Sequence, residues 1–169
     1  QFRRQPLSLH SLLVGRPQMF MDLICAVFKP ANRELKPVSE ADSRFARAAY
    51  GLLKDLQVLP GQNGEEVDAE ALLAWCREVR KIAVEVDRIK ITDQQIGALL
   101  AYAPSSQVDG AWPHEAVRNV IEHFSSEEVE LGLTIERFNM RGAYVKKIGE
   151  GGEQERVLAK QYQNWAKMM

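Results

Sequence analysis

Residues 68–88 read DAEALLAWCREVRKIAVEVDR, and this stretch decides the fold. Its apolar residues recur at steps of three and four, the spacing that lines one side of an α-helix. They are Leu72, Trp75, Cys76, Val79, Ile82, Ala83 and Val86. Charged residues such as Arg77 and Glu78 fill the positions between them and are expected to face water. Because so distinct an apolar side must be covered by other helices, the stretch predicts a helical bundle.

The same helical period recurs before and after this stretch. Capping-box patterns that begin at Ser39, Thr92 and Ser125 indicate helix starts, and Asp68 is positioned to cap the helix just described. No segment shows the apolar and polar alternation of a strand that is half buried. The predicted fold class is therefore all-α, an irregular bundle of about six to seven helices.

Length and composition are those of one globular domain. The chain has 169 residues, of which 46% are apolar and 27% are charged, and a chain of this length can bury about two thirds of its unfolded surface. We predict a single helical domain over residues 16–169, preceded by a loosely ordered segment at residues 1–15. Because the chain begins with Gln1 and a helical pattern is still running at Met169, we expect it to be a piece of a larger protein.

The composition also indicates the setting and the class of partner. Cys25 and Cys76 lie inside apolar helical patterns, which predicts buried free thiols and a reducing, cytoplasmic location. No apolar run approaches the ~20 residues that cross a bilayer, so we expect no membrane partner. The net charge of -1 argues against nucleic acid as a partner, because nucleic-acid-binding domains are usually strongly basic.

Two patterns look like known sites, but their spacing or charge does not fit. His114 and Glu115 could begin a zinc-protease motif, which needs a second His four residues after the first, whereas His123 is nine residues away. Both histidines are therefore expected to be polar surface residues. The glycine-rich residues 149–152 precede a helix and could bind phosphate, but the glutamates around them would repel an anion. We expect no metal, no cofactor and no catalytic residue.

One basic segment is a candidate contact surface. Residues 137–147 contain four basic residues without an intervening acid, and aromatic residues lie among them. Trp112 precedes Pro113 and is the tryptophan that we most expect to be partly exposed. Loops on a rigid helical frame often carry binding residues, although a solvated loop with its aromatic side chains turned inward would show the same pattern. The predicted partner-binding residues are Trp112, Arg137, Arg141, Tyr144, Lys146 and Lys147.

Short motifs in the second half of the chain resemble a known group of proteins. They are DQQIG at 93–97, WP at 112–113, AVR at 116–118, RG at 141–142 and GGEQER at 151–156. Together with residues 162–166, they resemble the C-terminal region of large uncharacterised bacterial proteins, and the resemblance extends from Phe20 to the end of the chain. It implies an intracellular helical end-domain of a bacterial multidomain protein, and it implies no catalytic residue.

These observations favour a non-catalytic helical interaction or scaffold domain of a larger bacterial protein. Its partner would be another domain of the parent chain or another protein. One alternative is a ligand-binding or enzymatic domain with a pocket between helices, lined by residues such as Arg118, Glu122, Arg141 and Tyr144. Another is a nucleic-acid accessory domain, whose binding would depend steeply on salt concentration.

Overall fold

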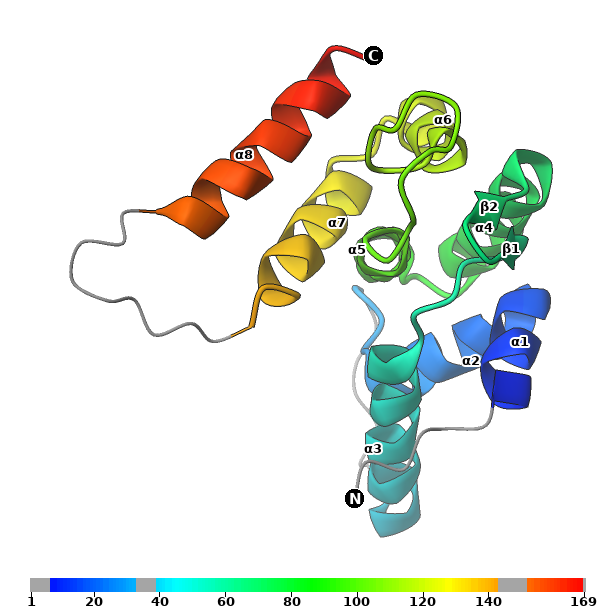
Figure 1. Cartoon of the computed structure of the whole chain (residues 1–169). Helices are drawn as coiled ribbons and strands as arrows, with labels where there is room; N and C mark the ends of the chain where they lie inside the picture. The colour runs from blue at the N-terminus through cyan, green and yellow to red at the C-terminus, as the bar shows by residue number, and fades with distance from the viewer. Residues whose placement is uncertain (1–6, 33–38, 143–151, 169) are drawn as a thin grey trace.

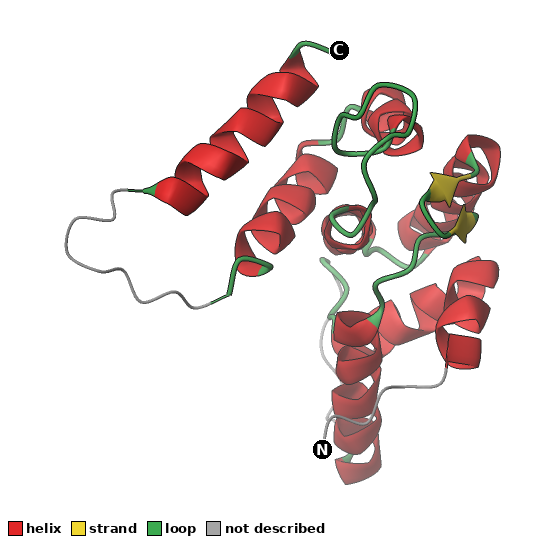
Figure 2. Ribbon diagram, in the orientation of Figure 1, coloured by secondary structure: helices red, strands yellow, loops and turns green. Residues whose placement is uncertain are grey.

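The computed structural model describes residues 7–32, 39–142 and 152–168 (Figure 1). Within these ranges the chain forms eight α-helices and one two-stranded hairpin, so the all-α fold class is confirmed (Figure 2). The elements are α1 (Leu7–Gly15), α2 (Pro17–Val27), α3 (Glu40–Asp55), β1 (Gln62–Asn63), β2 (Glu66–Val67), α4 (Ala69–Glu85), α5 (Ile89–Leu100), α6 (Glu115–Phe124), α7 (Glu127–Asn139) and α8 (Glu153–Ala166). The prediction of six to seven helices was too low, because the structure has an additional helix, α1. This helix lies in the segment predicted to be loosely ordered. Leu13 fixes α1 to the rest of the chain, because its side chain is buried in the core.

Helix α4 is the centre of the bundle, as its apolar stripe predicts. Its inward side chains are buried, and the helix packs against α2, α5 and α6. Trp75 contacts the ring of Phe20 on α2 edge-on, with 4.9 Å between the ring centroids. Ile82 and Val86 lie at the margin of the same core and are half-buried. The small hairpin β1–β2 precedes α4, with Gln62 paired to Val67, and it forms no part of a larger sheet in the described chain.

The helix starts follow the predicted caps in two cases and differ in two. Ser39 and Asp42 form a complete capping box, and the carboxylate of Asp68 accepts the amide N–H groups of Glu70 and Ala71. Helix α5 begins at Ile89, so Thr92 is a buried residue inside the helix rather than its cap. Helix α7 is capped by Ser126 instead of Ser125, which has the left-handed conformation that ends α6.

Helices α3 and α8 lie at the edge of the bundle. The apolar residues of α3 recur at helical spacing, but within the helix only Ala49 is buried, and Phe45 is 58% exposed. Figure 1 shows why, because α3 packs at one end and its N-terminal half extends beyond the other helices. Helix α8 has no buried residue. None of the described helices is long and apolar enough to cross a membrane.

Candidate functional site

A groove runs between α3 and α7 and has a cavity volume of about 280 Å³. Residues of α5 also line it, together with Phe20 and Phe28. Apolar groups on its walls include Tyr50 on α3 and Ile135 on α7, which are 52% and 50% exposed. Two large apolar side chains are therefore half-exposed in one groove. We name it the α3–α7 groove.

A buried carboxylate lies in the α3–α7 groove. Glu136 on α7 is 9% exposed, although it is charged. Its Oε1 atom accepts a hydrogen bond from the hydroxyl of Tyr102 at 2.6 Å, and its Oε2 atom accepts one from Nζ of Lys54 at 3.4 Å. These three side chains come from α3, from the turn after α5 and from α7, so only the folded bundle brings them together.

Tyr102 is a hydrogen-bond donor in this cluster. Burial is the main cause that raises the pKa of its hydroxyl, and the hydrogen bond to Glu136 and the negative charge of that residue act in the same direction. Together they bring the pKa to about 12, against a smaller opposing effect of Gln57. The hydroxyl therefore stays protonated at neutral pH and keeps one oxygen of Glu136 occupied.

The three predicted contact residues that the structure describes lie elsewhere, where α8 packs against α7 and the loop before α6. Trp112 is only 6% exposed, so the expectation that it would be partly exposed was wrong. Its indole N–H donates to the carbonyl of Ala103 at 3.0 Å, and the rings of Tyr162 and Trp165 on α8 cover it with centroids 6.2 and 6.3 Å away. The guanidinium of Arg137 lies 4.3 Å from the centroid of the Trp112 ring. The structure thus brings Trp112 and Arg137 together, but under α8.

Arg141 is also engaged with its own chain. Its guanidinium lies 3.8 Å from the centroid of the Phe138 ring, and it pairs with Glu155 on α8 at 3.9 Å. Arg137 and Arg141 both line a second cavity, of about 540 Å³, between α7 and α8. The other three predicted residues, Tyr144, Lys146 and Lys147, lie outside the described residues.

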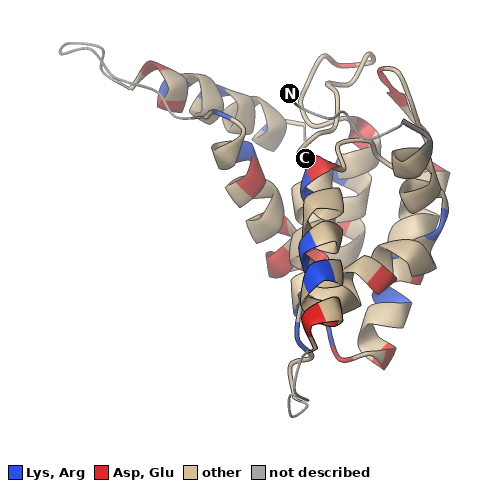
Figure 3. Cartoon of the chain, turned by 90° about the horizontal axis from the view of Figure 1, so that it is seen from below, with Lys and Arg blue, Asp and Glu red and all other residues tan. Residues whose placement is uncertain are grey.

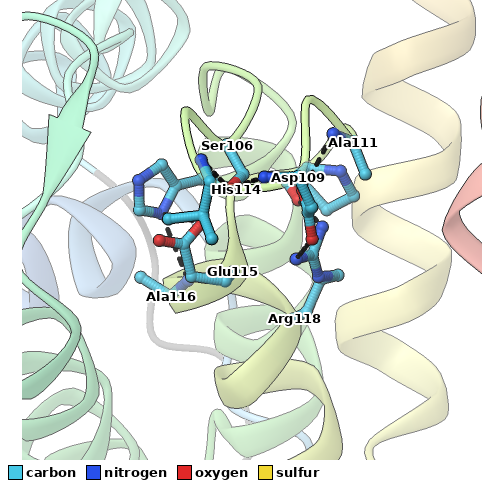
Figure 4. A network of polar contacts seen from close by, with 9 residues as sticks. Ser106, Asp109, Ala111, His114, Glu115, Ala116 and Arg118 are labelled. Carbon is cyan, nitrogen blue, oxygen red and sulfur yellow. Dashed lines mark hydrogen bonds and ion pairs between the residues drawn. The ribbon is translucent and has the colours of Figure 1, made fainter. Parts of the chain in front are cut away.

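A polar network joins the loop before α6 to that helix (Figure 4). His114 is 2% exposed, and its Nδ1 atom accepts the amide N–H of Ala116 at 3.2 Å, so the expectation that it lies on the surface was wrong. The buried Arg118 donates to the carbonyl of Pro113 at 3.0 Å and pairs with Asp109. The network anchors the loop and caps α6, and we assign it a structural role.

Two carboxyl groups of this network, those of Asp109 and Glu115, have lowered pKa values. The hydrogen bond from the amide of Ala111 lowers the pKa of Asp109 against the effect of desolvation, and Arg118 lowers it further. Desolvation raises the pKa of Glu115, but the hydrogen bond with Ser106, its backbone contact and two neighbouring basic residues outweigh this and leave the pKa lowered. Both groups are therefore carboxylates at neutral pH.

The described residues of the alternative pocket, Arg118, Glu122 and Arg141, do not line a common cavity. Arg118 belongs to the polar network, Glu122 is exposed on α6 and Arg141 lies beyond the C-terminal end of α7, while Tyr144 lies outside the described residues. Neither of the two cavities is lined by Arg118 or Glu122. Among the described residues, no group of three His, Cys, Asp or Glu side chains is placed to hold a metal ion.

Sequence reasoning missed the cluster of Lys54, Tyr102 and Glu136. One signal was available, because Val129, Gly132, Leu133 and Glu136 share helical spacing, which puts a glutamate on the inner side of α7. Comparison with known proteins adds no information on this cluster, since no protein-family model, curated protein or solved structure matches the chain.

Proposed function

We propose that the chain is a helical, non-catalytic protein-interaction domain that binds a segment of another protein, or of another domain of its parent chain, in the α3–α7 groove. The observation that carries the proposal is the pair of half-exposed side chains, Tyr50 and Ile135, on the walls of one hollow. Single exposed apolar residues are common on protein surfaces, but apolar groups gathered around a concave site are typical of binding surfaces.

The shape of the groove favours a helical or extended protein segment as the ligand. Its walls are helices, and an amphipathic segment that lies between two helices buries its apolar side against both of them. Tyrosine is enriched where proteins bind one another, because it offers a large ring and a hydrogen-bonding hydroxyl. Tyr50 meets this description.

The charge distribution favours a protein over a nucleic acid as the partner. Basic and acidic residues both occur along the helices in Figure 3, in keeping with the net charge of -1. A phosphate backbone would need a continuous basic surface. From the resemblance described above, we further propose that the domain belongs to a larger bacterial protein and acts in the cytoplasm.

The predicted basic surface remains a proposal for a second contact. Because α8 covers Trp112 and engages Arg137 and Arg141, a partner at this surface would meet α8 as well. Charge reversal at Arg141 and Lys146 tests it, and the surface is excluded if partner binding is unchanged.

Selection of peptides from a random phage-displayed library on the folded protein tests the groove. Enriched peptides should bind the wild type and lose most of their affinity for Ile135→Lys and Tyr50→Lys, which place a charge on the walls. Val84→Lys is the matched control, because Val84 is 65% exposed on α4 and does not line the groove. Peptides that bind the groove variants and the control equally well, or a selection that enriches none, would overturn the proposal.

A further inference from the structure

The two oxygens of the Glu136 carboxylate have unequal partners. Oε1 is held by the Tyr102 hydroxyl at 2.6 Å, whereas Oε2 has the longer contact of 3.4 Å with Lys54. The side chain of Lys54 is 47% exposed, and that of Glu136 is 12% exposed. Ion pairs with an exposed, flexible lysine stabilise a protein little, so a competing cation can readily replace Lys54 at Oε2.

The surroundings of Glu136 strengthen its preference for a cation. Apolar groups such as Leu53, Leu99 and Ile135 line the groove, and a carboxylate attracts a positive charge more strongly where water is partly excluded. The amide side chains of Gln95 and Asn139 line the same groove. Their carbonyl oxygens offer further acceptors for a guanidinium, which carries five N–H donors.

We infer that the α3–α7 groove recognises a basic residue of the bound segment, an Arg or Lys flanked by apolar residues, whose cation reaches Oε2 of Glu136 in place of Lys54. This inference rests on the proposed function of the groove and specifies the chemistry of the partner. A segment that places a carboxylate at the same point is rejected, because it would meet the charge of Glu136 directly.

Three small probes of similar size test the charge preference: phenethylamine, which is a cation at neutral pH, neutral 2-phenylethanol and anionic 3-phenylpropionate. Titrations followed by ¹H–¹⁵N NMR should show the amine shifting the amide signals of Ala98, Tyr102 and Ile135. The amine should bind roughly tenfold more tightly than the alcohol, the order expected of a charge-assisted hydrogen bond, and the propionate should bind weakest.

Two variants with opposite expected effects test the role of Glu136. Glu136→Gln keeps the size of the side chain and should bring the affinity for the amine down to that for the alcohol. Lys54→Met removes the competing cation from an exposed position and should raise the affinity for the amine several-fold, while the affinity for the alcohol stays the same. The second variant keeps the test valid if the first disturbs the fold.

Equal affinity of the wild type for amine and alcohol, no amine-induced shift at the groove residues, or a weaker affinity for the amine in Lys54→Met would overturn the inference. The peptides selected for the proposed function separate the two conclusions. Peptides that depend on Ile135 but lack a basic residue and bind Glu136→Gln normally would leave the interaction function standing and exclude the cation site. Peptides whose affinity is the same for the wild type and for Ile135→Lys would instead exclude the interaction function of the groove.

Discussion

Gly97 on α5 and Gly132 on α7 each face the backbone of the opposite helix. A Cβ atom at Gly97 would lie 2.0 Å from the carbonyl oxygen of Val129, and one at Gly132 would lie 2.0 Å from the carbonyl oxygen of Gln94. Distances this short are far inside van der Waals contact, and the obstructing atoms belong to backbone that cannot rotate away. The two helices can therefore pack this closely only with glycine at both positions, and this packing sets the relative position of two helices that line the α3–α7 groove.

Substitution of either glycine should strongly destabilise the chain. We expect Gly97→Ala and Gly132→Ala each to lower the free energy of unfolding by about 3 kcal/mol or more, because the helices must separate to admit a methyl group. Urea denaturation followed by circular dichroism measures this. Gly51→Ala in α3 is the matched control, since nothing lies within 4 Å of its Cβ position, and it should be stabilising by about 0.5–1 kcal/mol.

The ion pair between Arg80 and Asp93 gives a second prediction. Nε and Nη2 of Arg80 contact the two oxygens of Asp93 at 2.9 and 3.1 Å, and Asp93 is 3% exposed. Arg80→Met leaves a buried carboxylate without its cation and should lower the free energy of unfolding by about 3–5 kcal/mol. The double variant Arg80→Met with Asp93→Leu removes both charges and should regain much of that loss. A double variant no more stable than Arg80→Met would contradict this account.

The attachment of α8 gives a third prediction. Tyr162 and Trp165 hold this helix against Trp112, and Arg137 donates to the side chain of Gln161 at 3.1 Å. Each aromatic contact is worth only about 0.5–1.5 kcal/mol. Trp165→Ala should therefore release α8 alone, and hydrogen exchange should show faster exchange at residues 155–166 with unchanged protection in α4. Lys160→Ala, at an exposed position of the same helix, is the control and should leave the exchange of α8 unchanged.

Periodicity predicted the parts of the fold that depend on local sequence. The stripe on α4 gave the buried residues of that helix, since a helix with a continuous apolar side has few other ways to be covered. The cap at Ser39 was predictable for the same reason, because the bonds it makes lie within four residues. Phe45 shows the limit of predicting burial from periodicity. Its exposure depends on where the neighbouring helices end rather than on the pattern within α3.

The candidate site depends on long-range packing and was predictable only in part. Helical spacing places Glu136 on the inner side of α7, but Lys54 and Tyr102 are far from it in the sequence and nothing in the pattern pairs them with it. Trp112 is covered in part by α8, which begins forty-one residues later at Glu153. Thr92 has the pattern of a helix cap, but α5 begins earlier, at Ile89, and its Asp93 pairs with Arg80. In each case a contact with a distant element determines the structure, and the prediction from the neighbouring sequence fails.

The thiol of Cys76 should make the chain less stable at alkaline pH. Burial, with a smaller contribution from the charge of Asp93, raises its pKa from 9.0 to about 12 against an opposing effect of Arg80. Because the pKa is higher in the folded state than in the unfolded state, the contribution of this thiol to stability is complete below pH 9. It is lost as the pH rises toward 12, since only the unfolded chain ionises in that interval. Between pH 9 and 10 the loss should be about 1 kcal/mol.

Urea denaturation of the wild type and of Cys76→Ala at pH 8, 9 and 10 measures this loss. The alanine variant should be less stable at every pH, because it leaves a small cavity, but its stability should fall less steeply with pH than that of the wild type. Iodoacetamide labelling at pH 8 gives an independent readout, because the thiolate is the reactive form and Cys76 should be labelled only after unfolding. Parallel stability curves for the two proteins, or rapid labelling of Cys76 in the native state, would show that this thiol is not held protonated in the core.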